Sequence, residues 1–332
     1  MNVVIKKERD SNFELCRLAC MFYIVIYHLI IHVPDVYENT IWGRPIRTLC
    51  HIGVIVFVMI SGYYGIRRKW NRLIKLALSV SFYNGLGLIL AVLIFGVPFK
   101  FESLLPIILP ITKGGYWFIT SYIVLYLIAP YINIVFESVE KREFHIILAV
   151  LVGVVCYGGG LMDCEIGNGR GILAFVLSYS MGFYIHRFYP NGFSFPIVGN
   201  RPALVYWSFF FVLFVAIAFL PKMLSKAVNF MCFGYNEIGL FLMSILFLLM
   251  FHKFRMKNRY INWSATSVLG IYLLHGNPYV SSLVVYPLYT GIFNHVGNQV
   301  LLFVIHILFA FVVILICVLV DKSRQILFSF FE

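Results

Sequence analysis

The sequence predicts an all-α membrane protein, a bundle of about ten transmembrane helices with both termini in the cytoplasm. Of its 332 residues, 61% are hydrophobic and only 12% are charged, and the mean hydropathy is +0.90. A soluble domain has about twice that charged fraction. The apolar runs are far longer than the roughly ten residues of a transmembrane strand, and they do not alternate with polar residues. These observations exclude a soluble enzyme and favour membrane-spanning helices.

Ten apolar segments are long enough to be considered as spans, since about 20 residues cross a hydrocarbon core of ~30 Å. They cover residues 12–33, 48–66, 73–95, 116–133, 144–162, 171–186, 203–220, 234–251, 264–280 and 297–320. The turns after the second and eighth segments are strongly basic, and most of the 26 Lys and Arg residues fall on the side of the N-terminus. Because basic loops stay in the cytoplasm, both termini are expected there.

The same charge bias accounts for the formal net charge of +12, so we expect membrane lipids and no nucleic acid as partners. The basic start and first apolar run lack a small-residue cleavage site, which favours a retained helix over a signal peptide. The seven cysteines show no metal-ligand spacing, and no metal is expected. No linker or repeat marks a second domain, so residues 1–332 are expected to form one transmembrane unit without an appended soluble domain.

The first apolar segment contains one cation near its start and one imidazole deep inside it, Arg17 and His28. Eleven positions separate them, which corresponds to about 1100° of helical rotation and about 16 Å of rise. Both side chains therefore lie on one helix face, with Arg17 near a membrane surface and His28 near the middle of the hydrocarbon core. The alternatives are an interfacial anchor paired with Glu14 and a histidine buried by helix packing. Ionisable groups at such depth are functional candidates, and we predict His28 as a proton acceptor.

A cytoplasmic basic cluster precedes the third segment, and it includes Arg68, Arg72 and Lys75. A solvated charge run that stops membrane insertion is one interpretation. The other is a phosphate clamp, because Arg72 and Lys75 are three positions apart on one helix face. With Arg17 on the same side of the membrane, they are candidates for binding a polyanionic cofactor.

Two further ionisable residues are candidates near the base. His275 lies about 18 Å from the cytoplasmic end of the ninth segment, at about the depth of His28, so the two histidines are predicted to share a site. A packing hydrogen bond to a backbone carbonyl is the alternative for His275. Glu237 lies near the outer end of the eighth segment, where it is either exposed or orients a base.

Aromatic side chains gather near the outer end of the fourth segment, at Tyr116, Trp117 and Tyr122. Such residues commonly form an aromatic belt at the membrane interface. They are also platforms for sugar rings, which makes them candidates for substrate binding.

Several pieces of the chain, in order, resemble the acyltransferase-3 family of membrane O-acyltransferases. The first helix resembles the family in Asn12-Phe-Glu-Leu-Cys-Arg17 followed by His28. Its sequence is most similar to that of bacterial enzymes that acetylate surface polysaccharides. The other pieces are Phe57-Val-Met-Ile-Ser-Gly62, Arg72-Leu-Ile-Lys75, Tyr116-Trp-Phe-Ile-Thr-Ser-Tyr122 and Gly270-Ile-Tyr-Leu-Leu-His275. Lys75 stands where the family usually has a second Arg, and Lys lacks the bidentate geometry of Arg.

The resemblance implies an O-acetyltransferase of the bacterial cytoplasmic (inner) membrane. Acetyl-CoA would bind from the cytoplasm with its phosphates on Arg17, Arg72 and Lys75, and a sugar hydroxyl of a surface or exported glycan would approach from the other side. His28 would act as general base or would itself carry the acetyl group, and the sequence leaves both routes open.

Two other classes of function compete with an enzyme. Ten helices with histidines at mid-membrane depth also suit a transporter or flippase for a glycan or glycolipid. Against it, no pair of Gly- or Pro-interrupted helices occupies matching halves of the chain. A membrane scaffold without catalytic activity is the third possibility.

Overall fold

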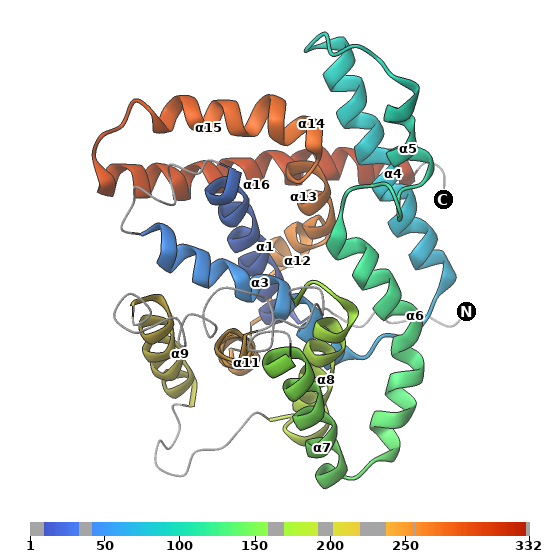
Figure 1. The fold of residues 1–332 in the computed structure, drawn as a ribbon, viewed down its shortest axis with the longest axis vertical. Coiled ribbons are helices and arrows are strands. Elements are labelled where there is room, and N and C mark those ends of the chain that lie inside the picture. Colours follow the sequence, from blue (N-terminus) through green and yellow to red (C-terminus); the bar gives the residue numbers. More distant parts are fainter. Residues whose placement is uncertain are drawn as a thin grey trace.

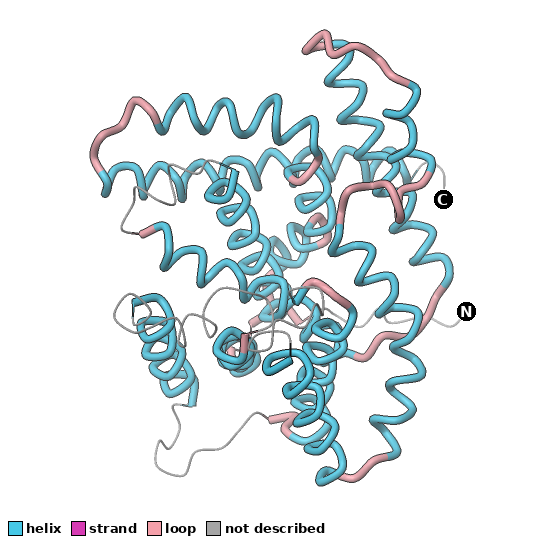
Figure 2. The backbone as a smooth tube through the Cα atoms, viewed as in Figure 1, coloured by secondary structure: helices cyan, strands magenta, loops and turns pink. Residues whose placement is uncertain are grey.

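The computed structural model describes residues 10–32, 42–158, 169–191, 202–219, 237–254 and 256–329. Within these ranges every regular element is a helix, and short loops join many of them (Figure 2). The N-terminal half contains α1 (Ser11–His32), α3 (Gly43–Tyr64), α4 (Trp70–Leu93), η1 (Phe101–Leu104), α5 (Leu105–Ile108), α6 (Trp117–Ser138), α7 (Lys141–Val152) and η2 (Gly153–Gly158). The C-terminal half contains α8 (Ile172–Phe188), α9 (Pro202–Phe219), α11 (Ile238–Lys253), α12 (Arg259–Ala265), α13 (Val268–His275), α14 (Pro278–Val280), η6 (Ser281–Val285), α15 (Tyr286–Phe293) and α16 (Gln299–Ser329).

Helices α1 and α3 lie at the centre of the bundle (Figure 1). They pack against each other, α1 also packs against α12, α13 and α16, and α3 packs against α8 and α11. Three groups of buried apolar side chains surround this pair. One joins α1 to α4, α13 and α16, the second joins α1 and α3 to α9 and α11, and the third joins α3 to α6, α7 and α8. The two central helices thus lie between these three groups of buried side chains.

Glycines allow α3 to approach its neighbours closely. A Cβ atom at Gly62 would overlap the backbone of Tyr179 on α8, and one at Gly182 on α8 would overlap the backbone of Met59 on α3. Toward α1, a Cβ at Gly53 would lie 2.9 Å from the carbonyl oxygen of Cys20. Small residues at helix interfaces permit such contact between backbones in membrane bundles.

The described residues contain five helices that are long and apolar enough to cross a membrane, within α1, α3, α4, α6 and α16. A sixth span results if α13 and the 278–293 segment, which are bent by 59° relative to each other, count as one. Three shorter apolar helices, α8, α9 and α11, lie beside them. The chain is therefore a multi-pass helical membrane protein, and the count of ten spans and the cytoplasmic termini stay predictions.

The predicted ninth helix over 264–280 differs from the structure. An interruption separates α12 from α13, and α13 ends at His275. Asn277 then caps α14, because its side-chain oxygen accepts hydrogen bonds from the backbone N–H groups of Tyr279 (3.0 Å) and Val280 (3.2 Å), and Pro278 occupies the first turn. The segment that follows, η6 and α15, was expected to be a loop and is helical.

Several other helix boundaries differ from the prediction, among them those of the fifth and the last helix. The predicted fifth helix changes at Gly153 from α7 into the π-helix η2, and the predicted residues 159–162 of that helix lie outside the described part of the chain. The last helix extends to Ser329, about two turns beyond the predicted end at residue 320. Its polar last turns stay helical because Asp321, Arg324 and Gln325 bond to one another at helical spacing.

Candidate active site

A cavity of about 560 Å³ lies between α1, α3, α4, α6 and the α12–α13 region. Both predicted residues of the first helix, Arg17 and His28, line it. The three predicted aromatic residues Tyr116, Trp117 and Tyr122 line it as well. The eleven-residue spacing therefore does place a cation and an imidazole on one side of the same pocket.

Arg17 is held by a carboxylate one turn earlier on α1. Its guanidinium donates a hydrogen bond of 3.0 Å to the buried Glu14, while 30% of the Arg17 side chain stays exposed. An ion pair at this spacing orients the long side chain and compensates the buried carboxylate. Arg17 therefore both pairs with Glu14, as the alternative interpretation expected, and lines the cavity.

His28 is in hydrogen-bond contact with His275 across the α1–α13 interface. Their facing nitrogens, Nδ1 of His28 and Nε2 of His275, are 3.0 Å apart, and the ring centroids are 4.9 Å apart. On the other side of its ring, Nδ1 of His275 lies 2.5 Å from the carbonyl oxygen of Ile271. The structure thus brings together the two histidines that the sequence placed at one depth.

These contacts determine which nitrogens carry protons in the neutral pair. A carbonyl oxygen only accepts hydrogen bonds, so Nδ1–H of His275 donates to Ile271. The Nε2 of His275 is then an acceptor, and Nδ1–H of His28 donates to it. The lone pair of the His28 ring is left on Nε2, the nitrogen opposite the contact. The arrangement prepares His28 to accept a proton or to attack a carbonyl carbon, with His275 as the residue that orients it.

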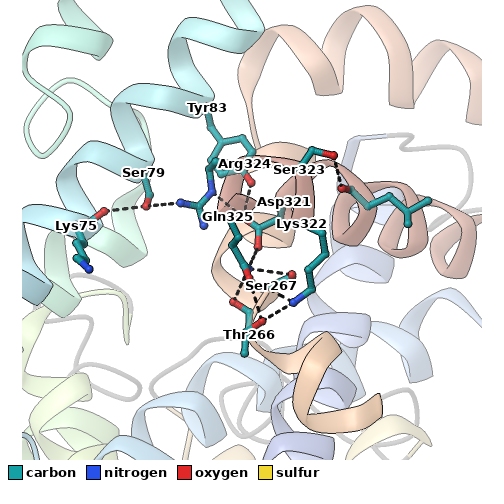
Figure 3. Close-up of polar contacts among 11 residues, drawn as sticks. Lys75, Ser79, Tyr83, Thr266, Ser267, Asp321, Lys322, Ser323, Arg324 and Gln325 are labelled. Carbon is teal, nitrogen blue, oxygen red and sulfur yellow. Dashed lines mark hydrogen bonds and ion pairs between the residues drawn. The ribbon is translucent and has the colours of Figure 1, made fainter. Parts of the chain in front are cut away.

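A buried carboxylate fixes the helix that carries His275. Asp321 of α16 accepts hydrogen bonds from Tyr83 of α4 (2.6 Å), Arg324 (2.8 Å) and Gln325 (2.5 Å), as Figure 3 shows. A Cβ at Gly270 of α13 would overlap this carboxylate, so the glycine allows α13 to lie directly against it. The packing sets the position of α13 one and a half turns before His275.

The same network reaches the wall of the cavity. Lys322 donates to the hydroxyl of Thr266 at 2.6 Å, and Gln325 donates to Ser267 at 3.3 Å (Figure 3). Lys322 also donates to the carbonyl oxygen of Trp263 at 2.6 Å. Thr266 lines the cavity. The break between α12 and α13 is therefore tied to α16 by side-chain hydrogen bonds.

The aromatic side chains have different environments within the cavity. The Tyr116 hydroxyl donates to the carbonyl oxygen of Leu273 at 2.7 Å, which ties α6 to α13. The Tyr122 hydroxyl is 3.2 Å from the hydroxyl of Ser61, which also lines the cavity. Trp117 presents its indole ring to a cation, Arg170. Tyr116 and Tyr122 thus use their hydroxyl groups for hydrogen bonds within the cavity wall, whereas the Trp117 ring contacts a cation.

The predicted phosphate clamp is not among the residues that line the cavity. Arg72 is exposed on the first turn of α4, yet it is close enough to act electrostatically on Tyr122, as Arg17 does. Lys75 is exposed one turn later, and its carbonyl oxygen accepts a hydrogen bond from Ser79 (2.8 Å; Figure 3). Arg68 donates to Tyr131 at 3.2 Å. The structure thus places Arg72 near the cavity and turns Arg68 toward α6.

Glu237 does not join the histidines. It is buried at the N-terminal cap of α11, and its charge acts on Cys156 of η2. This position is on the α9–α11 side of the central helices, away from the cavity. Its burial contradicts the alternative that Glu237 is exposed, and the described residue that contacts the His28 ring nitrogen Nδ1 is His275.

Sequence reasoning missed several polar residues of the cavity, among them Ser61, Thr266 and Arg170. Ser61 is within the second-helix piece of the family resemblance and gives no signal of its own. Arg170 does give one, since it is a cation next to an apolar segment on the side of the membrane where the charge bias predicts few.

The chain matches the family model described as an acyltransferase domain, Acyl_transf_3, over residues 10–321. The match spans nearly the whole chain and includes Arg17, His28 and His275. Neither the curated proteins nor the solved structures give a match. The pocket lined by a cation and an oriented histidine fits acyl transfer, and the chain belongs to the acyltransferase-3 family, which makes it a membrane acyltransferase.

Proposed function

We propose that this protein is an O-acetyltransferase that moves an acetyl group from cytoplasmic acetyl-CoA to a sugar hydroxyl of a surface or exported glycan in the bacterial inner membrane. The observation that carries the proposal is that Arg17 and His28 line one cavity, eleven residues apart on one face of α1, and that His275 contacts His28 from the α13 side.

The donor enters past the cations of the cytoplasmic end. Arg17 and Arg72 lie near Tyr122 and bind phosphate groups of acetyl-CoA, and Lys75 adds charge at the entrance. The rise of about 16 Å between Arg17 and His28 is spanned by the extended arm of the donor, which brings its thioester to His28.

His28 then removes the proton of the sugar hydroxyl through Nε2. The hydroxyl oxygen forms a bond to the thioester carbonyl carbon, the carbon–sulfur bond breaks, and the proton passes from His28 to the departing CoA thiolate. The products are an acetyl ester and CoA. Hydrogen bonding to His275 keeps the lone pair on Nε2 and stabilises the imidazolium that forms, since His275 accepts from Nδ1–H throughout.

A second route passes through an acetyl-histidine. Nε2 of His28 attacks the thioester carbonyl carbon, the carbon–sulfur bond breaks, and CoA departs as a thiolate. The sugar hydroxyl oxygen then bonds to the acetyl carbon as the carbon–nitrogen bond to Nε2 breaks, and the hydroxyl proton neutralises the thiolate. Because Nδ1–H of His28 donates to His275, Nε2 is the nitrogen that carries the lone pair in both routes.

The test is release of CoA from acetyl-CoA by the protein in vesicles, with and without a glycan fraction from its host. We expect glycan-dependent release in the wild type, a loss of about 10²- to 10⁴-fold in His28→Ala, and normal release in Arg142→Ala, which changes an exposed arginine of α7. Transport of a glycan across the vesicle without release of CoA would refute the proposal in favour of a carrier.

A further inference from the structure

Arg170 has a defined position at the wall of the cavity. Its carbonyl oxygen accepts a hydrogen bond of 2.9 Å from Ser121 of α6, which fixes the backbone just before α8. Its guanidinium carbon lies 5.6 Å from the centroid of the Trp117 ring, and both residues line the cavity. A cation over an indole face is attracted to it and is held in one orientation.

The cavity has two positively charged ends. At one end, Arg17 and Arg72 act electrostatically on Tyr122. At the other end, Arg47 and Arg170 act on Tyr27, the residue that precedes His28, and on His51. Because Arg17 and Tyr27 are ten residues apart on α1, about 15 Å of helix separates the two ends. Arg170 thus belongs to the His28 end.

Within the described part of the chain, no carboxylate forms an ion pair with Arg170. Arg17 and Arg324, by contrast, are each paired with a carboxylate. Arg170 is exposed at the wall of the cavity, and its positive charge attracts anions to that end. A bidentate guanidinium is the side chain that best matches a carboxylate or phosphate group.

We propose that Arg170 binds an anionic group of the acceptor, so that the preferred acceptor is a saccharide with a carboxylate or a phosphate near the hydroxyl that is acetylated. The inference rests on the proposed function, since it names the class of its acceptor. Trp117 supports the guanidinium from behind, and the sugar lies between Arg170 and His28. The donor phosphates occupy the other end, near Arg17.

The alternative role for Arg170 is stabilisation of the negative charge that develops on the thioester oxygen. That role would be independent of the charge of the acceptor, because the same oxygen becomes negative with every acceptor. The two roles therefore predict different kinetic effects, namely a change in the KM of charged acceptors or a uniform fall in kcat.

The experiment compares three probes with the same ring, methyl glucoside, methyl glucuronide and glucose 1-phosphate. Binding of each to the purified protein in vesicles is measured by calorimetry without acetyl-CoA, and release of CoA is measured with it. The variants are Arg170→Gln and Arg170→Lys, and Arg142→Gln is the control because Arg142 is an exposed arginine of α7. Comparison of methyl glucuronide with glucose 1-phosphate shows whether a carboxylate or a phosphate is preferred.

We expect the wild type and Arg142→Gln to bind at least one anionic probe more tightly than the neutral one. Arg170→Gln should abolish that preference with a loss of about 10- to 100-fold for the anionic probe, as for a lost charge-assisted hydrogen bond, and Arg170→Lys should restore part of it. Equal binding of the three probes by the wild type, or an unchanged preference in Arg170→Gln, would overturn the inference. If the preference depends on Arg170 but no probe or host glycan supports release of CoA, the anion site stands and the proposed function fails.

Discussion

The contact between His28 and His275 makes a quantitative prediction for the substitution His275→Leu. The variant removes the acceptor that lies 3.0 Å from Nδ1 of His28 and leaves a donor without that partner beside the cavity. A buried group that loses its partner costs about 1–3 kcal/mol. Since each 1.36 kcal/mol is a factor of ten, the turnover of acetyl-CoA should fall by about 5- to 150-fold.

His275→Gln is the matched variant, because its side-chain oxygen is able to accept from Nδ1–H of His28. It should retain more activity than His275→Leu. Removal of the base itself, in His28→Ala, should cost about 10²- to 10⁴-fold. The assay is glycan-dependent release of CoA, with protein amount and folding matched by gel filtration.

The double variant His28→Ala/His275→Leu decides whether His275 acts through His28. If it does, the double variant should be no slower than His28→Ala alone, because the orienting residue has nothing left to orient. Multiplicative losses in the double variant would refute the tautomer argument and give His275 a separate role.

Three further predictions concern other parts of the site. Arg17→Lys keeps the charge next to Glu14 but loses the planar guanidinium, so the KM for acetyl-CoA should rise about tenfold with kcat nearly unchanged, and Arg142→Lys should have no effect; a change confined to kcat would contradict this. Gly270→Ala pushes against the buried carboxylate of Asp321 and should lower the free energy of unfolding in detergent by about 1–3 kcal/mol, while Gly291→Ala, with nothing near its Cβ, should not; equal stability of the two would refute the packing argument. Tyr116→Phe loses the hydrogen bond to the Leu273 carbonyl and should destabilise the protein by about 0.5–1.5 kcal/mol in the same unfolding measurement, and an unchanged midpoint would show that this contact contributes nothing.

Helical periodicity was enough to predict the pairing of Arg17 and His28 on one face. Both residues lie in α1, a regular helix without Gly or Pro, where angular positions are additive over three turns. The two histidines predicted to share a site are in contact, although α12 and α13 are not one helix. The depth of either histidine in the membrane stays a prediction.

Helical periodicity did not predict the position of Glu237 in the bundle or the turn that follows α13. Glu237 and His28 are on different helices, and only the packing of α11 against α3 and α9 decides which side of the bundle a residue on α11 faces. The turn at Asn277 depends on hydrogen bonds that its side chain accepts from the backbone of Tyr279 and Val280. Because the sequence on both sides is apolar, it resembles one continuous helix. Arg170 differs, because the charge bias of the loops already made it an unusual cation on the predicted outer side.

The close contact between α3 and α8 has a consequence for how substrates enter. With the backbones touching at Gly62 and Gly182, these two helices cannot move further together, and separating them would open a gap along the whole interface. Of the elements around the cavity, α1 and α3 are therefore its fixed wall. The other walls are α4, α6 and the α12–α13 break. Of these, α4 and the α12–α13 break are hydrogen-bonded to α16, through Asp321 and Lys322. A substrate that displaces α4 or the α12–α13 break on entry must weaken these hydrogen bonds. Binding in the cavity should therefore change the conformation of the C-terminal helix α16.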